Sequence, residues 1–280
     1  MTDPLSEPVA DVAGASGYDA HPPRVGFFTD TTVCIGCKAC EVACKEWNLV
    51  PDDGFDLLGM SYDNTGMLGA NSWRHVAFIE QPARTGAESG QEFRWLMASD
   101  VCKHCTRAGC LDVCPTGALF RTEFGTVVVQ PDICNGCGYC VSACPYGVIE
   151  RRDGDGRAWK CTLCYDRLRG GLEPACAKAC PTDSIQFGAL DELRVRARQR
   201  VEALHEQGVA EARLYGESPD DGVGGQGSIF LLLDEPEVYG LPPDPVVPTR
   251  DLPRMWRYAA LAGVAMLGAI VAAFQEGRRR

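Results

Sequence analysis

Basic residues are scarce relative to acidic ones in this sequence of 280 residues. Lysine and arginine together number 27, against 38 aspartates and glutamates, which gives a formal net charge of −11. Nucleic-acid binding depends on a basic face that neutralises phosphates, so this balance argues against that class of function. An acidic surface either meets a basic protein partner or keeps the chain soluble, and solubility is the simpler interpretation.

The sequence also lacks the marks of secretion and of catalysis. Residues Met1–Glu7 contain neither a basic segment nor an apolar run, so we expect no secretory signal there. If the chain leaves the cytoplasm, we expect it to travel with a partner that carries the signal. The pattern contains no nucleophile with its base and no pair of acidic catalytic groups. These absences favour a non-catalytic role.

Cysteine, by contrast, is in excess. All 16 cysteines lie between Cys34 and Cys180, whereas a disulfide scaffold would be a short secreted chain. They form four groups of four. Group one is Cys34, Cys37, Cys40 and Cys44; group two is Cys102, Cys105, Cys110 and Cys114; group three is Cys134, Cys137, Cys140 and Cys144; group four is Cys161, Cys164, Cys176 and Cys180.

The spacing within these groups is typical of [4Fe–4S] clusters. Three thiolates with two residues between them wrap around one cube, and a fourth, three residues further on, reaches a second cube, as in two-cluster ferredoxins. Pro115, Pro145 and Pro181 follow the fourth cysteine of groups two, three and four, while group one has Lys45 instead. Groups one and three have identical spacing and read as internal copies. We therefore predict four clusters.

Two other uses of cysteine fit less well. A structural zinc site usually takes two CxxC pairs separated by a longer stretch, and group four alone matches that pattern loosely. Groups one and three crowd three ligands into seven residues, which such a site does not need. A CxxC pair can close a disulfide, but the third cysteine of each tight loop would then lack a partner.

The pairing of the groups is open at this level. Exchange of fourth cysteines between paired groups permits three pairings. Groups two and three are separated by 19 residues that contain a hairpin-like segment, 118–129, which suits one ferredoxin-like unit. That would leave group one with group four. Group three is also close to group four in sequence, so spacing alone does not choose.

Four lysines and one histidine within or beside the groups are candidates for a role near the clusters. Lys38, Lys103, Lys160 and Lys178 either tune the reduction potential of an anionic cluster or merely solubilise a loop, and the sequence leaves both open. His104 lies inside group two. We expect it to be a solvent-facing loop histidine rather than a ligand.

We predict an α+β fold in which the clusters take the place of much of the core. Short apolar runs predict strands at 25–29, 75–80, 93–97, 118–121, 126–129, 147–151, 184–187 and 229–233. The predicted domains are a mobile N-terminal arm at 1–24, a four-cluster domain at 25–188 with an insertion at 45–101, an extension at 189–250 that packs on it, and a membrane anchor at 251–280.

Two helices are predicted in the C-terminal third. In the extension, Leu190, Leu193, Ala197, Val201 and Leu204 recur at steps of three and four, and a glycine follows as a stop signal. We expect this helix to pack on the cluster domain.

The second helix is a candidate membrane span. Residues 258–274 contain no charge and just reach across a hydrocarbon core at about 1.5 Å per residue. Trp256 and Tyr258 fit an interfacial aromatic belt. Arginines flank both ends, so charge does not decide the orientation.

With these groups in place, the chain resembles the iron–sulfur (beta) subunit of respiratory, membrane-bound formate dehydrogenase. That subunit belongs to the four-cluster ferredoxin family that partners molybdenum or tungsten oxidoreductases. The resemblance runs from about Val25 to the C-terminus. The matching stretches are 34–48 (CIGCKACEVACKEWN), 62–64 (YDN), 134–140 (CNGCGYC), 160–164 (KCTLC), 173–182 (EPACAKACPT) and 239–242 (YGLP).

The resemblance implies two ferredoxin-like modules, each with two clusters, that join group one to group four and group two to group three. It assigns the ligands to four sets, numbered here one to four. Set one is Cys34, Cys37, Cys40 and Cys180; set two is Cys44, Cys161, Cys164 and Cys176; set three is Cys102, Cys105, Cys110 and Cys144; set four is Cys114, Cys134, Cys137 and Cys140.

The resemblance also implies partners. Electrons from formate oxidation at a molybdopterin catalytic subunit would pass along the clusters to a haem b membrane subunit and quinone. The catalytic subunit of that family carries a twin-arginine signal, and the iron–sulfur subunit is exported with it, which would place the bulk of the chain on the outer face of a cell membrane. The alternatives are the same relay for a nitrate, sulfoxide or polysulfide reductase, or a non-redox zinc scaffold.

Overall fold

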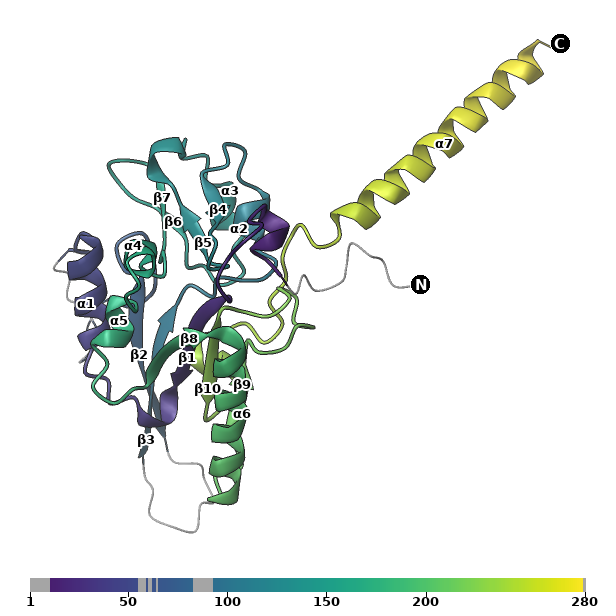
Figure 1. Cartoon of the computed structure of the whole chain (residues 1–280). Coiled ribbons are helices and arrows are strands. Elements are labelled where there is room, and N and C mark those ends of the chain that lie inside the picture. The colour runs from purple at the N-terminus through teal and green to yellow at the C-terminus, as the bar shows by residue number, and fades with distance from the viewer. Residues whose placement is uncertain (1–10, 55–58, 60–61, 64, 83–92, 279–280) are drawn as a thin grey trace. The chain divides into compact units, whose positions relative to one another are not determined.

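A computed structural model describes residues 11–54, 59, 62–63, 65–82 and 93–278 (Figure 1). The chain divides into two compact units. Among the described residues, one unit spans 11–247 and contains all the cysteines, and the other contains 248–278. Asn64 of the family-like YDN stretch and residues 1–10 of the predicted arm lie outside the described residues.

A four-stranded sheet lies at the centre of the larger unit. Its strands, in spatial order, are β8 (Ile185–Ala189), β1 (Val25–Asp30), β10 (Ser228–Leu232) and β9 (Arg213–Tyr215). β1 is parallel to β10 and antiparallel to β8, with Phe28 opposite Ile229 in the register. Both β1 and β10 are buried along almost their whole length, which requires cover on both faces of the sheet.

The two faces of this sheet have different cover. On one face, Phe28 and Ile229 pack with Leu193 of α6 (Leu190–Glu206). On the other, Phe27 and Phe230 join a core that contains five buried cysteines. Neighbouring strand residues point to opposite faces, so the Phe27–Phe28 pair serves both layers. The sheet thus separates the α6 layer from the cysteine layer.

The predicted amphipathic helix is confirmed as α6. Leu190, Leu193, Ala197 and Leu204 are buried against the sheet, and Val201 is half-buried. After this helix, β9 and β10 belong to the central sheet, and β10 confirms the strand predicted at 229–233.

A long antiparallel hairpin stands on the cysteine side. It consists of β2 (Arg74–Pro82) and β3 (Phe93–Val101), with Arg74 opposite Val101. Two cysteine-bearing helices lie beside it, α1 (Ala39–Asn48) and α5 (Ala175–Lys178). The predicted strands at 75–80 and 93–97 are therefore confirmed and extend further than predicted.

Smaller elements surround the remaining cysteines. Two short hairpins are β4 (Leu119–Arg121) with β5 (Val127–Val129), and β6 (Glu150–Arg151) with β7 (Ala158–Trp159). The helix α2 (Gly109–Asp112) precedes the first hairpin, α3 (Tyr139–Ser142) lies between the two hairpins in sequence, and α4 (Tyr165–Arg169) follows the second. The 3₁₀ turns η2 (Thr31–Val33) and η3 (Pro131–Ile133) precede groups one and three. A further 3₁₀ turn, η4 (Pro236–Tyr239), follows β10.

The described part of the predicted N-terminal arm contacts the rest of the larger unit near both of its ends. Val12 and Ala13 are buried, and the turn η1 (Gly14–Ser16) follows them. Arg24 donates hydrogen bonds to the Thr106 hydroxyl and the His104 carbonyl at 2.8 Å each. Val12, Ala13 and Arg24 therefore pack against the body of the unit, whereas residues 15–17, 19–20 and 22–23 are exposed.

In the smaller unit, α7 (Leu252–Gly277) contains the predicted span. Within residues 254–276, the most apolar stretch of 18 residues has a mean hydropathy of 1.8, and this is the one helix in the described residues that is long and apolar enough to cross a membrane. Its large apolar side chains, such as Leu261, Val264 and Phe274, are exposed within the chain itself. A helix apolar on all sides needs a lipid or protein environment.

Candidate metal centres

The four CxxC turns share one backbone feature. In each, the residue just before the second cysteine has a positive φ: 65° at Gly36, 43° at His104, 71° at Gly136 and 56° at Leu163. This left-handed conformation folds the turn so that backbone N–H groups face the sulfur of the first cysteine. In group four, the Leu163 N–H lies 3.2 Å from Cys161 Sγ.

Groups one and three are copies in structure as well as in spacing. A 3₁₀ turn precedes each group, and a second left-handed residue, Lys38 or Gly138, begins the helix that follows. The common backbone confirms the prediction of an internal copy. It also explains why glycine recurs at positions 36 and 136, where a positive φ costs other residues about 1–2 kcal/mol.

Short helices bring the groups together in pairs. α1 carries Cys40 and Cys44, and these lie one turn apart on the same helical face. It packs against α5, which carries Cys176. In the same way α2, with Cys110, packs against α3, with Cys140. These contacts join group one to group four and group two to group three, a choice that spacing left open.

Set one lines a single cavity. Its four cysteines, Cys34, Cys37, Cys40 and Cys180, are the cysteines in the lining, which also contains apolar side chains such as Val76. Cys37 is exposed to solvent, whereas Cys40 is buried. Burial raises the pKa of the Cys40 thiol to about 11.

Set two is the most deeply buried. Cys44 has Cys161, Cys164 and Cys176 as its charged neighbours, and all four cysteines are buried. The Asn48 side-chain amide donates to Cys44 Sγ and to Cys164 Sγ, each at 3.7 Å, and so bridges two sulfurs from distant groups. Burial raises the pKa of Cys44 well above its ordinary value, so its thiolate needs a compensating positive centre.

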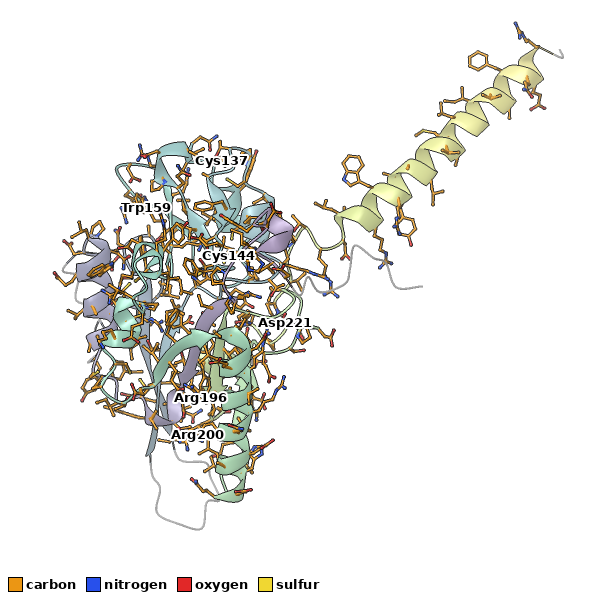
Figure 2. The ribbon with its side chains drawn as sticks, viewed as in Figure 1. Cys137, Cys144, Trp159, Arg196, Arg200 and Asp221 are labelled. Atoms are coloured by element: carbon orange, nitrogen blue, oxygen red, sulfur yellow. The ribbon has the colours of Figure 1, made fainter. Side chains whose placement is uncertain are left out.

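Set three lines another cavity. The lining contains Cys102, Cys105, Cys110 and Cys144, with no other cysteine; Cys144 is labelled in Figure 2. Burial raises the pKa of the Cys110 thiol to about 12. A metal that holds four such thiolates must therefore displace their protons.

Set four lies at the surface. Burial, followed by the negative charges of Cys134, Cys137 and Cys114, raises the pKa of Cys140 to about 11, so these four sulfurs are neighbours. Cys137, labelled in Figure 2, is exposed. It borders an open hollow whose lining also includes Arg151 and Arg152.

The sets follow one another in a line. Cys40 of set one interacts electrostatically with Cys176 of set two, Cys161 of set two with Cys102 of set three, and Cys110 of set three with Cys140 of set four. The exposed cysteines, Cys37 and Cys137, belong to the two end sets. The individual ligand assignments remain a prediction.

The residues present fit clusters better than single ions. In the described part of the chain, no three His, Cys, Asp or Glu side chains are close enough to hold one metal ion. A zinc site would draw its sulfurs to within about 2.3 Å of one atom. All 16 cysteines are free of disulfides. Sets one and three instead surround cavities, as a four-iron body requires.

Buried side-chain nitrogens without a hydrogen-bond partner also support the presence of clusters. Within the described residues, Arg74 Nε and His104 Nε2 are buried without a hydrogen-bond partner. His104 lines the cavity of set three, and its Nδ1 accepts the Val127 N–H at 3.1 Å, which leaves the proton of the neutral ring on Nε2. The expectation that His104 faces solvent is therefore wrong, because the left-handed turn directs its ring into the core.

The four lysines divide into two classes. Lys103 and Lys160 are fully buried, so the solubilising role does not apply to them. Lys178 is largely exposed, and Lys38 is half-buried between Glu41 and Asp63. Sequence reasoning missed three further groups near sulfur, Asn48, Arg74 and Ser99. An arginine or serine in a strand carries no signal of its own that it will meet a cysteine.

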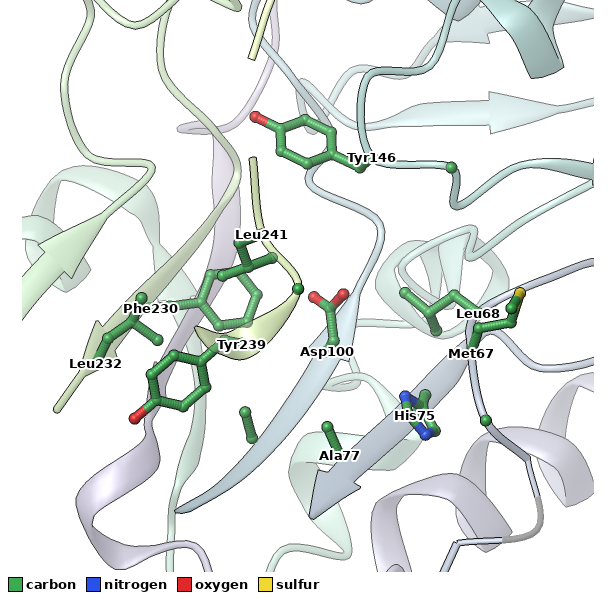
Figure 3. A pocket seen from close by; sticks show the side chains of 14 residues that line it. Met67, Leu68, His75, Ala77, Asp100, Tyr146, Phe230, Leu232, Tyr239 and Leu241 are labelled. Carbon is green, nitrogen blue, oxygen red and sulfur yellow. The ribbon is translucent and has the colours of Figure 1, made fainter. Parts of the chain in front are cut away.

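A separate cavity contains no cysteine in its lining (Figure 3). Tyr239, Leu241 and Phe230 line one side of it, and the β2–β3 hairpin lines the other with His75 and Asp100. Both polar groups have partners, since His75 bonds to Asp63 at 2.6 Å and Asp100 pairs with Lys103. This cavity is therefore distinct from the cluster sites.

Comparison with known proteins assigns these features to a family. The 4Fe-4S dicluster domain matches the chain twice, at residues 33–118 and 93–190. Two such domains provide four clusters, which agrees with 16 cysteines.

Known proteins extend the match beyond the clusters. The chain is 41% identical to the formate dehydrogenase iron–sulfur subunit of Haemophilus influenzae over 260 residues, which is 90% of this chain and 79% of the relative. It is 41% identical to the iron–sulfur subunit of the nitrate-inducible formate dehydrogenase of Escherichia coli, with 89% and 82% covered. A relative of another class comes from the anaerobic dimethyl sulfoxide reductase of Escherichia coli, and it is 38% identical over 61% of this chain and 76% of the relative. The chain therefore belongs to the family of formate dehydrogenase iron–sulfur subunits, which transfer electrons and are not catalytic.

Proposed function

We propose that this chain relays electrons through four [4Fe–4S] clusters from a molybdopterin formate dehydrogenase subunit to a haem b and quinone subunit in the membrane. The observation that carries the proposal is the linear order of the four cysteine sets, with an exposed cysteine in each end set and none in the middle sets. A chain of clusters that relays electrons needs accessible clusters at its two ends and clusters shielded from solvent in its middle.

The chain's own residues set the reduction potentials of the clusters and their exposure to water. Each bound cluster supplies one-electron redox chemistry, with a potential set by charge, hydrogen bonds to sulfur and exposure. The CxxC turns direct N–H groups at sulfur, as Leu163 does at Cys161. Apolar neighbours such as Val76 and Ile149 keep water from the cavities of sets one and three. We further propose the ligand sets and the ferredoxin-like modules that the family resemblance implies, and the domain boundaries predicted from the sequence.

The extent of similarity to known subunits favours formate as the substrate of the catalytic partner. Formate dehydrogenase subunits match about 90% of this chain, whereas the dimethyl sulfoxide reductase relative matches 61%. We also propose that α7 crosses the membrane once, with residues 258–274 in the hydrocarbon core. Co-export with a signal-bearing catalytic subunit would place the larger unit on the outer face.

Co-purification from native membranes tests the proposed partners. We expect a molybdopterin subunit and a haem b subunit to accompany the chain, and formate to reduce its clusters anaerobically. Analysis should give about 16 iron and 16 sulfide per chain. Recovery with a sulfoxide or nitrate reductase subunit instead would replace formate as the donor, and stoichiometric zinc without sulfide would refute the relay.

A serine substitution tests the ligand sets. We expect Cys44→Ser to alter the electron paramagnetic resonance (EPR) signal of set two, whose other ligands come from group four, and to leave set one intact. Cys37→Ser is the matched control, because it lies in the same group but should affect set one alone. If both variants perturb the same cluster, the exchange of fourth cysteines between groups is wrong.

A further inference from the structure

Arg74 occupies an unusual position for a charged side chain. It begins β2, is only 2% exposed, and its guanidinium lies 4.7 Å from the ring centre of Phe27. In the described residues no carboxylate forms an ion pair with it. A buried, unpaired guanidinium is strongly unfavourable unless negative charge lies nearby.

The negative charge near Arg74 comes from two cysteine sets. Its Nη2 donates to Cys176 Sγ of set two at 3.3 Å. Its Nη1 donates to the Ser99 hydroxyl at 3.2 Å, and that hydroxyl lies 3.3 Å from Cys40 Sγ of set one. A continuous hydrogen-bonded path therefore runs from a sulfur of set one through Ser99 and Arg74 to a sulfur of set two.

Lys160 repeats this arrangement at the next junction. It is 1% exposed, and its ammonium donates to the carbonyls of Val127 and Cys161. It lines the cavity of set three, beside Cys102 and Cys110, while Cys161 belongs to set two. The described residues again provide no carboxylate that forms an ion pair with it.

The other three lysines near the sets are each paired with a carboxylate. Lys103 is fully buried but pairs with Asp100, and Lys38 pairs with Glu41 and Asp63. Lys178 lies between two ligands in sequence, yet its side chain is 72% exposed and pairs with Glu173. Arg74 and Lys160 thus differ from these lysines in being both buried and unpaired.

We propose that Arg74 and Lys160 are shared potential-setting cations, Arg74 for the clusters of sets one and two and Lys160 for those of sets two and three. The proposal rests on the ligand sets above. A buried positive charge favours the state with the extra electron, because the surroundings screen it weakly. Set two has both cations as neighbours, so the reduction potential of its cluster is raised the most.

EPR-monitored redox titration of the intact complex tests the proposal. We expect Arg74→Gln to lower the midpoint potentials of two clusters by at least about 59 mV, a tenfold change in the reduced-to-oxidised ratio. Lys160→Gln should also lower two potentials, and one cluster should be common to both pairs. Ser99→Ala should lower only the potential of set one.

The controls separate this role from a purely structural one. Lys178→Gln should leave all four potentials unchanged, and iron and sulfide content should show four clusters in every variant. If Arg74→Gln loses clusters, Arg74→Lys should retain them with smaller shifts, since it keeps the charge. Three results would each overturn the proposal: unchanged potentials in Arg74→Gln with four clusters present, no effect of Ser99→Ala, or an equal shift in Lys178→Gln. A missing cluster in the native chain would instead refute the ligand sets.

Discussion

At the scale of single residues, burial controls the chemistry of the cysteines. Thiols such as Cys40 and Cys110 have their pKa raised to about 11 and about 12, so without metal they are protonated at neutral pH. Cluster assembly must therefore release protons, and this release makes binding weaker as the pH falls. Cys37 and Cys137 differ from these thiols because both are exposed to solvent.

Asp63 offers a test at the same scale. Burial alone would raise its pKa, but hydrogen bonds from His75 and Lys38 outweigh burial and lower the pKa to about 2. A lowered pKa stabilises the folded state above the ordinary value of 3.8, and this stabilisation is lost as the pH falls toward 2. We expect Asp63→Asn to cost on the order of 2 kcal/mol near neutral pH.

Anaerobic urea unfolding at several pH values would measure this effect. The difference between native chain and variant should shrink as the pH approaches 2. Glu202→Gln, at an exposed position of α6, is the control and should change little. A difference that is constant with pH would show that Asp63 acts through packing instead of charge.

At the scale of elements, the left-handed turn of each CxxC loop is the critical feature. A Cβ added at Gly136 would lie 2.5 Å from the backbone carbonyl oxygen of Gly156, and the residue also has a φ of 71°. We expect Gly136→Ala to displace the turn and to cost the chain one cluster, so that iron content falls by about a quarter. Gly154→Ala is matched in backbone strain, with a φ of 93°, but has open space around it. Equal iron content in the two variants would contradict this reasoning.

The packing of α6 allows a second test at this scale. Leu193 is 1% exposed in the layer between α6 and the sheet, whereas Val195 is 53% exposed on the same helix. We expect Leu193→Ala to lower the free energy of unfolding by about 2–5 kcal/mol and Val195→Ala to lower it by less than about 0.5 kcal/mol. Thermal unfolding of the two variants side by side measures the difference. Similar unfolding temperatures would mean that α6 does not stabilise the sheet.

At the scale of the whole molecule, α7 is expected to hold the chain in a membrane. An arginine at Val264 would place a charge near the middle of residues 254–276, at a cost of about 2.5–3.5 kcal/mol. We expect Val264→Arg to make the chain extractable from membranes by alkaline carbonate, and Val264→Leu to leave it in the membrane. If removal of residues 252–280 does not change the fractionation, α7 is not the anchor.

The four cysteine groups, the copy relation between groups one and three, and the helix at 190–206 were evident from the sequence because each is a local pattern. Spacing in a CxxC turn reflects backbone geometry over a few residues, and helical periodicity repeats every turn. The pairing of groups was not accessible in this way, since α1 and α5 meet only after the chain has folded over more than 120 residues.

The sequence by itself therefore determined the number of clusters, the turns that begin each site and the amphipathic helix. Only the tertiary structure decided which groups meet, why His104 is buried, and which cations lie between sets. Arg74 reaches Cys176 across 102 residues, and Lys160 reaches the carbonyl of Val127 across 33. Such contacts depend on long-range packing, and no local pattern of residues encodes them.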